Sequence, residues 1–214
     1  IAQEVAKYPK LLESLPAKDS GVRYRLEGYL FPATYTIKES TTIESLIDEM
    51  LATMDKNLSP HYATIKEKNL TVNELLTIAS LVEKEGAKTE DRKLIAGVFY
   101  NRLNLGIPLQ SNIAILYAEG KLGQKISLAD DVAIDTAIDS PYNVYTNIGL
   151  MPGPVDSPSL DAIESSINQT KSDNLFFVAN VQDGKVYFAA TKEEHDKNVE
   201  KHINSKLKQS NNAN

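Results

Sequence analysis

Residues 76–86 read L-T-I-A-S-L-V-E-K-E-G and place two glutamates at the end of an apolar run. Just upstream, T-V-N-E at 71–74 has the form of a capping box, in which Thr71 and Glu74 satisfy each other's backbone donors. Gly86 is a natural residue just past the end of a helix. The stretch therefore predicts a helix over residues 71–85.

The two glutamates of this helix are not equivalent on a wheel of 3.6 residues per turn. Glu83 falls in the middle of an apolar arc, whereas Glu85 points away, beside Ile78 and Glu74. The arc consists of Val72, Leu75, Leu76, Ala79 and Val82. We therefore expect Glu83 to face the core or a cleft, and Glu85 to lie at a rim or in solvent.

Two physical effects are expected to raise the pKa of Glu83. Burial beside apolar side chains disfavours the charged carboxylate, and so does the partial negative charge at the C-terminal end of a helix. A carboxyl group that stays protonated near neutral pH can donate its proton to a leaving oxygen, as a general acid must. The alternative is a structural glutamate whose carboxylate is satisfied by an arginine or by backbone donors.

The composition restricts the chemistry. The chain has 214 residues, 42% of them hydrophobic, which is enough for one compact body or two small ones. A net charge of -6 argues against a nucleic-acid-binding protein, which would need a basic face. There is no cysteine for thiol catalysis, disulfides or thiolate metal sites, and the histidines His61, His195 and His202 show no metal-ligand spacing. We therefore expect no cofactor and no metal.

The rest of the chain predicts an α+β fold, with a helical catalytic core, a few antiparallel strands and a C-terminal β-hairpin plus helix. Residues 24–37 are aromatic and β-branched, which predicts extended structure broken at Pro32. L-F-F-V-A-N-V and K-V-Y-F-A-A, around Q-D-G, predict a hairpin. The remaining predicted helices begin near residues 43, 90, 112, 158 and 192.

Two further regions carry candidate binding residues. Arg102 shares a helical face with apolar residues, where a guanidinium could hold a carboxylate or a sugar hydroxyl, or pair with a structural acid instead. Asn101 lies beside it, and Gln110 follows G-I-P-L, where its amide could face an acetamido group. A long loop over 141–158, dense in Pro, Gly and Asn, is typical of a functional loop.

Sugar rings have apolar faces, and tyrosines offer both stacking area and a hydroxyl group. Tyr142 and Tyr145 of the long loop, with Asn143 and Thr146, are therefore candidate sugar contacts. The alternative is a loop that its own tyrosines pin to the body of the protein.

Five motifs, in order from about residue 26 to residue 202, together resemble the YceG-like family, the endolytic murein transglycosylases of bacteria. They are L-E-G-Y-L-F-P-A-T-Y, I-A-S-L-V-E-K-E-G, V-F-Y-N-R-L-N-L-G-I-P-L-Q-S, S-P-Y-N-V-Y-T-N-I-G-L-M-P-G-P and F-F-V-A-N. The resemblance implies that Glu83, the first glutamate of V-E-K-E, is the catalytic acid. It also implies substrate contacts at motif positions, namely Asn101, Arg102, Gln110, Tyr142, Asn143, Tyr145 and Thr146.

The resemblance further implies a single-pass enzyme of the cell membrane whose catalytic domain is extracytoplasmic and cuts nascent peptidoglycan glycan strands. Cell-wall synthases are its candidate protein partners. No run here is long enough to span a membrane, and the chain starts at Ile1, so we expect a truncated chain that lacks its N-terminal anchor. Residues 1–38 are expected to be the remnant of, or the link to, a LysM-like subdomain. Residues 39–209 would be the catalytic domain and 210–214 a disordered tail.

The mechanism that the resemblance implies needs one carboxylate, which first donates a proton to the glycosidic oxygen and then deprotonates the C6 hydroxyl of the same sugar. The products carry 1,6-anhydro-N-acetylmuramic acid ends. A hydrolytic muramidase is the first alternative and would need a second acid, for which Asp131, Asp135 and Asp139 are candidates. A non-catalytic glycan-binding scaffold of the cell-wall machinery is the second alternative.

Overall fold

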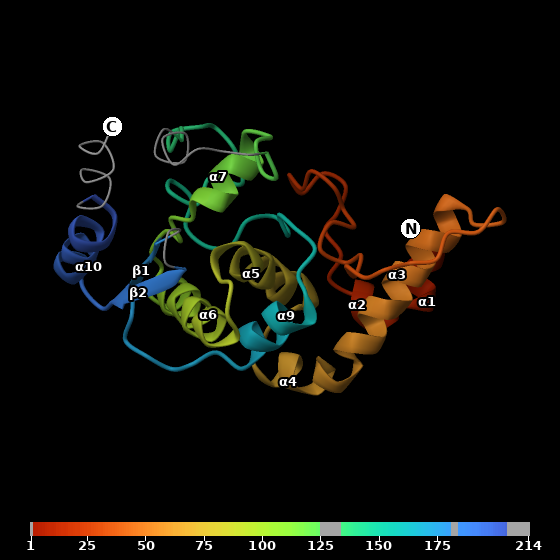
Figure 1. Ribbon diagram of the computed structural model, residues 1–214. Helices are drawn as coiled ribbons and strands as arrows, with labels where there is room; N and C mark the ends of the chain where they lie inside the picture. Colours follow the sequence, from red (N-terminus) through yellow and green to blue (C-terminus); the bar gives the residue numbers. More distant parts are fainter. Residues whose placement is uncertain (1, 125–133, 181–183, 205–214) are drawn as a thin grey trace.

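The computed structural model describes residues 2–124, 134–180 and 184–204, which form an α+β fold as the sequence predicts. Three helices, α5 (Val72–Glu85), α6 (Thr89–Asn104) and α9 (Leu160–Ile167), pack together at its centre (Figure 1). No helix in the described ranges is both long and apolar enough to cross a bilayer. The flanking elements are α1 (Ala2–Lys7), α2 (Pro9–Leu12), α3 (Ile43–Leu58), η1 (Ser59–His61), α4 (Tyr62–Glu67), α7 (Asn112–Ala118), β1 (Phe176–Asn180), β2 (Lys185–Ala189), α10 (Lys192–Val199) and η2 (Glu200–Asn204).

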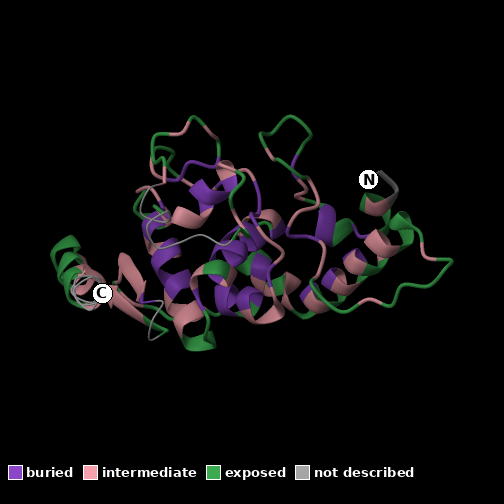
Figure 2. Ribbon diagram, turned by 45° about the horizontal axis from the view of Figure 1, so that its top comes forward, coloured by how far each residue is buried: buried purple, intermediate pink, exposed green. Residues whose placement is uncertain are grey.

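Helix α5 begins at the predicted capping box. The Thr71 hydroxyl accepts the backbone N–H of Glu74 at 3.1 Å, and the Glu74 carboxylate accepts the N–H of Thr71 at 2.8 Å. From Leu75 to Val82 every side chain of α5 is buried (Figure 2). The buried surface of α5 is therefore wider than the predicted apolar arc, because this part of the helix is buried on all sides.

Two hydrophobic clusters meet on α5, which explains its complete burial. Leu75 and Leu76 belong to a cluster with α2, α3 and α9, whereas Leu81 and Val82 belong to a second cluster with α6 and α7. Tyr29 is packed in the first cluster together with residues of α2. Parts of residues 1–38 thus share a core with the remainder of the chain, and the predicted domain division at residue 38 stays a prediction.

Close packing between α6 and the segment after α9 depends on Gly97. A Cβ atom added at Gly97 would lie 2.6 Å from the carbonyl oxygen of Thr170, which is closer than real Cβ contacts allow. The backbone N–H of Thr170 donates to the carbonyl oxygen of Lys93 at 3.1 Å. This contact fixes the position of the chain that leads from α9 into β1.

The predicted hairpin is confirmed by the antiparallel pairing of β1 with β2, in a register that places Phe176 opposite Ala189 and Phe177 opposite Phe188. Two residues of its predicted turn, Gln182 and Asp183, lie outside the described residues. Helix α10 packs on both strands, so hairpin and helix form one end of the molecule (Figure 1).

The prediction of extended structure over residues 24–37 is wrong in its first part, and no strand forms there. Residues 25–29 form turns, and Gly28 adopts a φ of 81°, in the left-handed region that favours glycine. Tyr29 is fully buried in the first cluster. The aromatic residue that suggested a strand therefore fills the core from a turn.

Candidate active site

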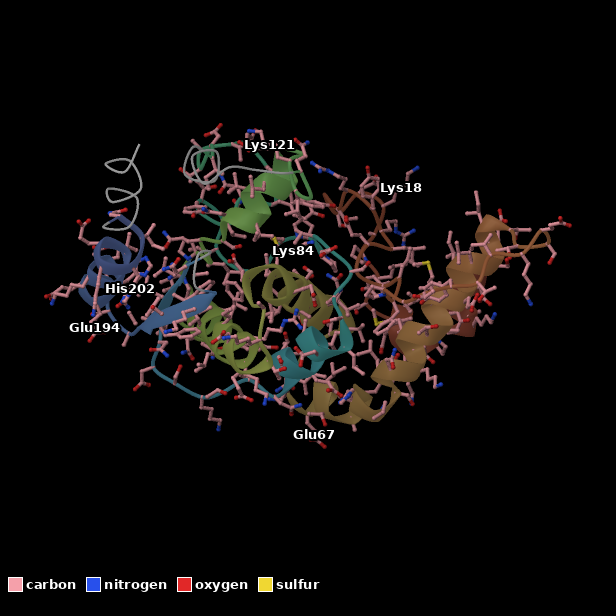
Figure 3. All side chains as sticks on the ribbon, viewed as in Figure 1. Lys18, Glu67, Lys84, Lys121, Glu194 and His202 are labelled. Atoms are coloured by element: carbon pink, nitrogen blue, oxygen red, sulfur yellow. The ribbon has the colours of Figure 1, made fainter. Side chains whose placement is uncertain are left out.

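A groove of about 850 Å³ lies where the C-terminal end of α5 meets α6, the hairpin and α10. Figure 3 shows Lys84 at this end of α5; it is one of the residues that line the groove. Apolar side chains form much of the wall: Val98, Leu109, Ile113, Phe176, Phe177 and Val186. A volume of this size and an apolar wall with a few polar groups are typical of a ligand-binding site.

Glu83 lies in this groove with its side chain 23% exposed. One carboxylate oxygen, Oε1, accepts a hydrogen bond from Arg92 Nη2 at 2.9 Å. The other, Oε2, accepts from the backbone N–H of Ser159 at 3.0 Å and from its hydroxyl at 2.5 Å. The carboxylate is thus fixed by three donors yet keeps contact with the groove.

Glu83 does face a cleft with a largely apolar wall, which is one of the two surroundings expected from the sequence. Its carboxylate oxygens, however, bond to an arginine and to Ser159, as in the alternative of a satisfied structural glutamate. Ser159 is the N-cap of α9, so Glu83 lies beside the N-terminal end of α9, which carries partial positive charge. Glu83 itself belongs to the C-terminal end of α5, which carries partial negative charge. The sequence shows only the second of these effects, because Ser159 is 76 residues away along the chain.

Glu85 also lines the groove and is half-buried, which is compatible with the predicted position at a rim. Its Oε1 accepts a hydrogen bond from the buried Ser111 hydroxyl at 2.8 Å. Glu83 and Glu85 are the two acidic residues among those described as lining the groove. Asp135 and Asp139 do not line it, and Asp131 lies outside the described residues.

Arg102 is almost fully buried, at 5% exposure, and its guanidinium joins three chain segments. Nε donates to the carbonyl oxygen of Pro108 at 2.8 Å, and Nη1 donates to that of Leu175 at 2.6 Å. Nη2 donates to Gln110 Oε1 at 2.5 Å. Burial lowers the pKa of Arg102. Arg102 and Gln110 both line the groove, where the arginine also builds its wall.

Tyr145 lines the groove and bonds through its hydroxyl to Asn112 Oδ1. Thr146 is exposed and does not line the described groove. The structure therefore brings Tyr145 together with Glu83, Arg102 and Gln110.

Three other predicted contacts bond to protein groups away from the groove lining. Tyr142 is buried against the Tyr117 ring, and its hydroxyl accepts the N–H of Arg23 at 3.3 Å. Asn143 donates to the carbonyl oxygens of Thr136 and Ile138. Asn101 donates to those of Ser172 and Asn174. These bonds pin the long loop and the approach to β1. As substrate contacts, all three residues and Thr146 stay predictions.

Sequence reasoning missed Arg92, Ser159, Asp161 and His195. His195 lies on α10, lines the groove and stacks on Phe176 at a centroid distance of 5.3 Å. Arg92 lies in the first turn of α6, and Ser159 precedes α9, where an N-cap serine is ordinary. Only the packing of three helices shows that Arg92 and Ser159 converge on Glu83.

No cluster of three or more histidine or acidic side chains that could hold a metal ion occurs within residues 2–124, 134–180 and 184–204.

Comparisons with known proteins agree on one family. A family model described as the YceG-like family matches residues 1–201. A protein named endolytic murein transglycosylase from Streptococcus pneumoniae serotype 2 (strain D39) is 84% identical over 207 residues, which are 97% of this chain and 38% of that protein. One of the same name from Bacillus subtilis (strain 168) is 39% identical over 189 residues, 88% of this chain and 51% of that protein. The chain thus spans about half the length, or less, of these curated relatives.

A solved structure gives the same result for the fold. A 2.6 Å crystal structure of a YceG-like protein from Listeria monocytogenes matches with a TM-score of 0.79 at 38% identity. The match covers 92% of this chain and 62% of that one.

Proposed function

The chain belongs to the YceG-like family, and from this premise we propose that it is the catalytic part of an endolytic murein transglycosylase. The names of its relatives in Streptococcus pneumoniae and Bacillus subtilis support this activity. The substrate would be a peptidoglycan glycan strand lying in the groove. Aromatic side chains on the groove wall, Phe176 and Phe177, suit the apolar faces of sugar rings.

Glu83 is the proposed acid and base. In its protonated form it donates to the glycosidic oxygen between N-acetylmuramic acid and N-acetylglucosamine, and that bond breaks as C1 of the muramic sugar gains positive charge. The Glu83 carboxylate then takes the proton from the C6 hydroxyl of the same sugar. The C6 oxygen bonds to C1 and closes a 1,6-anhydro ring, so that no water is consumed.

The surroundings of Glu83 fit both halves of this cycle. Arg92 and Ser159 donate to the ionised carboxylate that the second half requires. The first half requires the protonated form. A sugar that fills the groove would expel water from around the carboxyl group, and the loss of water disfavours a charged carboxylate. Acid–base help of this kind supplies a factor of about 10² to 10⁴ in rate.

The single observation that carries the proposal is a partly exposed carboxylate, fixed by donors from two other helices, in a groove with aromatic walls. The direct test is to digest purified peptidoglycan with the wild-type chain and with Glu83→Gln, and to analyse the new ends by mass spectrometry. We expect anhydro ends from the wild type and none from Glu83→Gln. Anhydro ends at the normal rate from Glu83→Gln would refute the role of Glu83.

A hydrolytic muramidase is the second candidate, because Glu85 supplies another carboxylate to the same groove. Hydrolysis needs a second acid or base, and its products carry a reducing end with one more water than an anhydro end. Glu85→Gln separates the two candidates. A transglycosylase keeps forming anhydro ends with this variant, whereas a muramidase that uses Glu85 stops forming reducing ends.

We also propose that the protein acts on the outer face of the cytoplasmic membrane, held by an N-terminal anchor outside this chain and working beside cell-wall synthases. The support is the location of the proposed substrate, which lies outside the cytoplasm. Protease treatment of intact spheroplasts that carry the full-length protein tests the location. Degradation of the catalytic part without lysis is expected, and complete protection would contradict it.

A further inference from the structure

Arg92 joins the ends of the three central helices. Its Nε donates to the carbonyl oxygen of Gly86 at 2.8 Å, directly after α5, while the side chain itself starts from the first turn of α6. Nη2 donates to Glu83 and Nη1 to Asp161 Oδ2 at 2.6 Å, in the first turn of α9. With 13% of its side chain exposed, Arg92 is held on all three nitrogens.

The Arg92 guanidinium is shared between two carboxylates, Glu83 and Asp161. Asp161 has a second donor, the hydroxyl of Thr89 at 2.8 Å. Burial acts to raise the pKa of Asp161, but the hydrogen bonds from Arg92 and Thr89 and the nearby positive charges outweigh it, so its pKa lies below the usual value. Asp161 therefore carries a negative charge beside Arg92 Nη1, whereas Glu83 bonds to Arg92 Nη2.

Gly86 leaves the room that Arg92 occupies. A Cβ atom at residue 86 would lie 2.8 Å from Arg92 Cγ and 3.1 Å from Ile95 Cδ1. The backbone at Gly86 is extended, with a φ of -117°, so the glycine is required for space and not for a left-handed conformation. The glycine that follows V-E-K-E thus serves the arginine that binds the first glutamate.

We propose that Arg92 is a positioning residue for Glu83, and that Asp161 tunes the proton affinity of Glu83 by competing for the same guanidinium. The proposal rests on the proposed function, in which Glu83 is the catalytic acid and base. It assigns a role to two residues that lie outside the five motifs of the family resemblance.

The sign of the effect follows from the charges. Arg92 alone would favour the ionised Glu83 carboxylate, and the negative charge of Asp161 offsets part of this. Removal of Asp161 should make Glu83 lose its proton at lower pH, whereas removal of Arg92 should make it keep the proton to higher pH. Besides Glu83 and Arg92, the charged or titratable side chains that line the groove within the described part of the chain are Lys84, Glu85, Arg102, Tyr145 and His195.

The test is a carbon-13 NMR titration of the Glu83 carboxyl group in the whole chain, with its signal identified by its loss in Glu83→Gln. We expect the Asp161→Asn midpoint to lie below that of the wild type and the Arg92→Gln midpoint to lie above it. Arg92→Lys keeps the charge and should return the midpoint toward the wild-type value.

Asp48→Asn is the matched control. Asp48 has a side-chain exposure of 37%, against 39% for Asp161, and it also pairs with a cation, Lys7, but lies on α3. It should leave the Glu83 midpoint unchanged. An Asp161→Asn midpoint that stays at the wild-type value or rises would overturn the proposal, as would a shift of equal size in Asp48→Asn.

The same variants are then assayed for the release of anhydro ends as a function of pH. Glu83 must be protonated to act as an acid. The alkaline limb of the pH profile should therefore shift to lower pH in Asp161→Asn and to higher pH in Arg92→Gln. A Glu83→Gln variant that still cleaves would refute the proposed function alone. The NMR titration would still decide whether Arg92 and Asp161 control the proton on Glu83.

Discussion

Glu83 and Ser159 lie 76 residues apart in the sequence and meet through two hydrogen bonds to one carboxylate oxygen. The same Ser159 hydroxyl caps α9 by accepting the N–H of Ala162 at 3.3 Å. One side chain therefore begins a central helix and holds the proposed catalytic carboxylate. The geometry of the groove and the stability of the fold depend on the same atom.

Replacing Ser159 with alanine should affect both properties. We expect the free energy of unfolding to fall by about 1 kcal/mol from the lost N-cap. We expect the cleavage rate to fall by roughly tenfold to hundredfold, because a hydrogen bond to a charged group is lost. Denaturant unfolding and the rate of end formation measure the two effects. Thr42→Ala, which removes the cap of α3, is the control and should cost similar stability with no loss of rate.

Replacing Gly86 with alanine should displace Arg92. The new methyl group meets Arg92 Cγ and Ile95 Cδ1, so we expect a loss of about 1 to 3 kcal/mol in the free energy of unfolding. A double-mutant cycle separates the two contacts. In an Arg92→Ala background, Gly86→Ala should lower the free energy of unfolding by less, because alanine has no Cγ atom for the new methyl group to meet. An equal cost in both backgrounds would mean that Gly86 does not make room for Arg92.

Arg102 is expected to be more important for the fold than its place in a family motif suggests. Lysine cannot reproduce the fork that binds Pro108, Leu175 and Gln110, so Arg102→Lys should cost about 2 to 4 kcal/mol in the free energy of unfolding. Arg25→Lys is the control, since its described side-chain hydrogen bond is a single one, to Pro16. Equal stability losses for the two variants would contradict the structural role.

Stability should depend on pH through His195. Burial first, and then the charge of Lys192, lower the pKa of His195, so the folded state favours the neutral ring. The stability from this residue is complete above the pKa of the unfolded chain, about 6.5, and is lost as pH falls toward the lower folded value. The free energy of unfolding, measured from pH 7.5 to pH 5, should show this loss. In His195→Gln the free energy of unfolding should depend less on pH over this range. His61→Gln, whose ring pairs with Glu164, is the control.

The features that the sequence predicted well are local ones. A capping box and a glycine marked both ends of α5, and Q-D-G between two apolar runs marked the hairpin, because these signals act over a few residues. Membership of the YceG-like family, predicted from five motifs, is confirmed. A cleft was one of the two surroundings that the helical wheel predicted for Glu83, and Glu83 lines the groove, although its role in catalysis stays a prediction.

The features that were missed depend on tertiary packing. The bonds between Glu83, Arg92 and Ser159 form because α5, α6 and α9 converge, and no spacing in the sequence reports this. A wheel separated Glu83 from Glu85, yet both line the groove, because the groove surrounds the last turn of the helix. Tyr29 suggested a strand but fills the core, since aromatic composition does not distinguish the two.

The fate of water tests the central claim most directly, because a transglycosylase consumes none. Peptidoglycan is digested by the wild-type chain in water labelled with a heavy oxygen isotope, and the new ends are analysed by mass spectrometry. The Glu83 mechanism predicts unlabelled 1,6-anhydro ends that disappear in Glu83→Gln. New reducing ends that carry the heavy oxygen would contradict it.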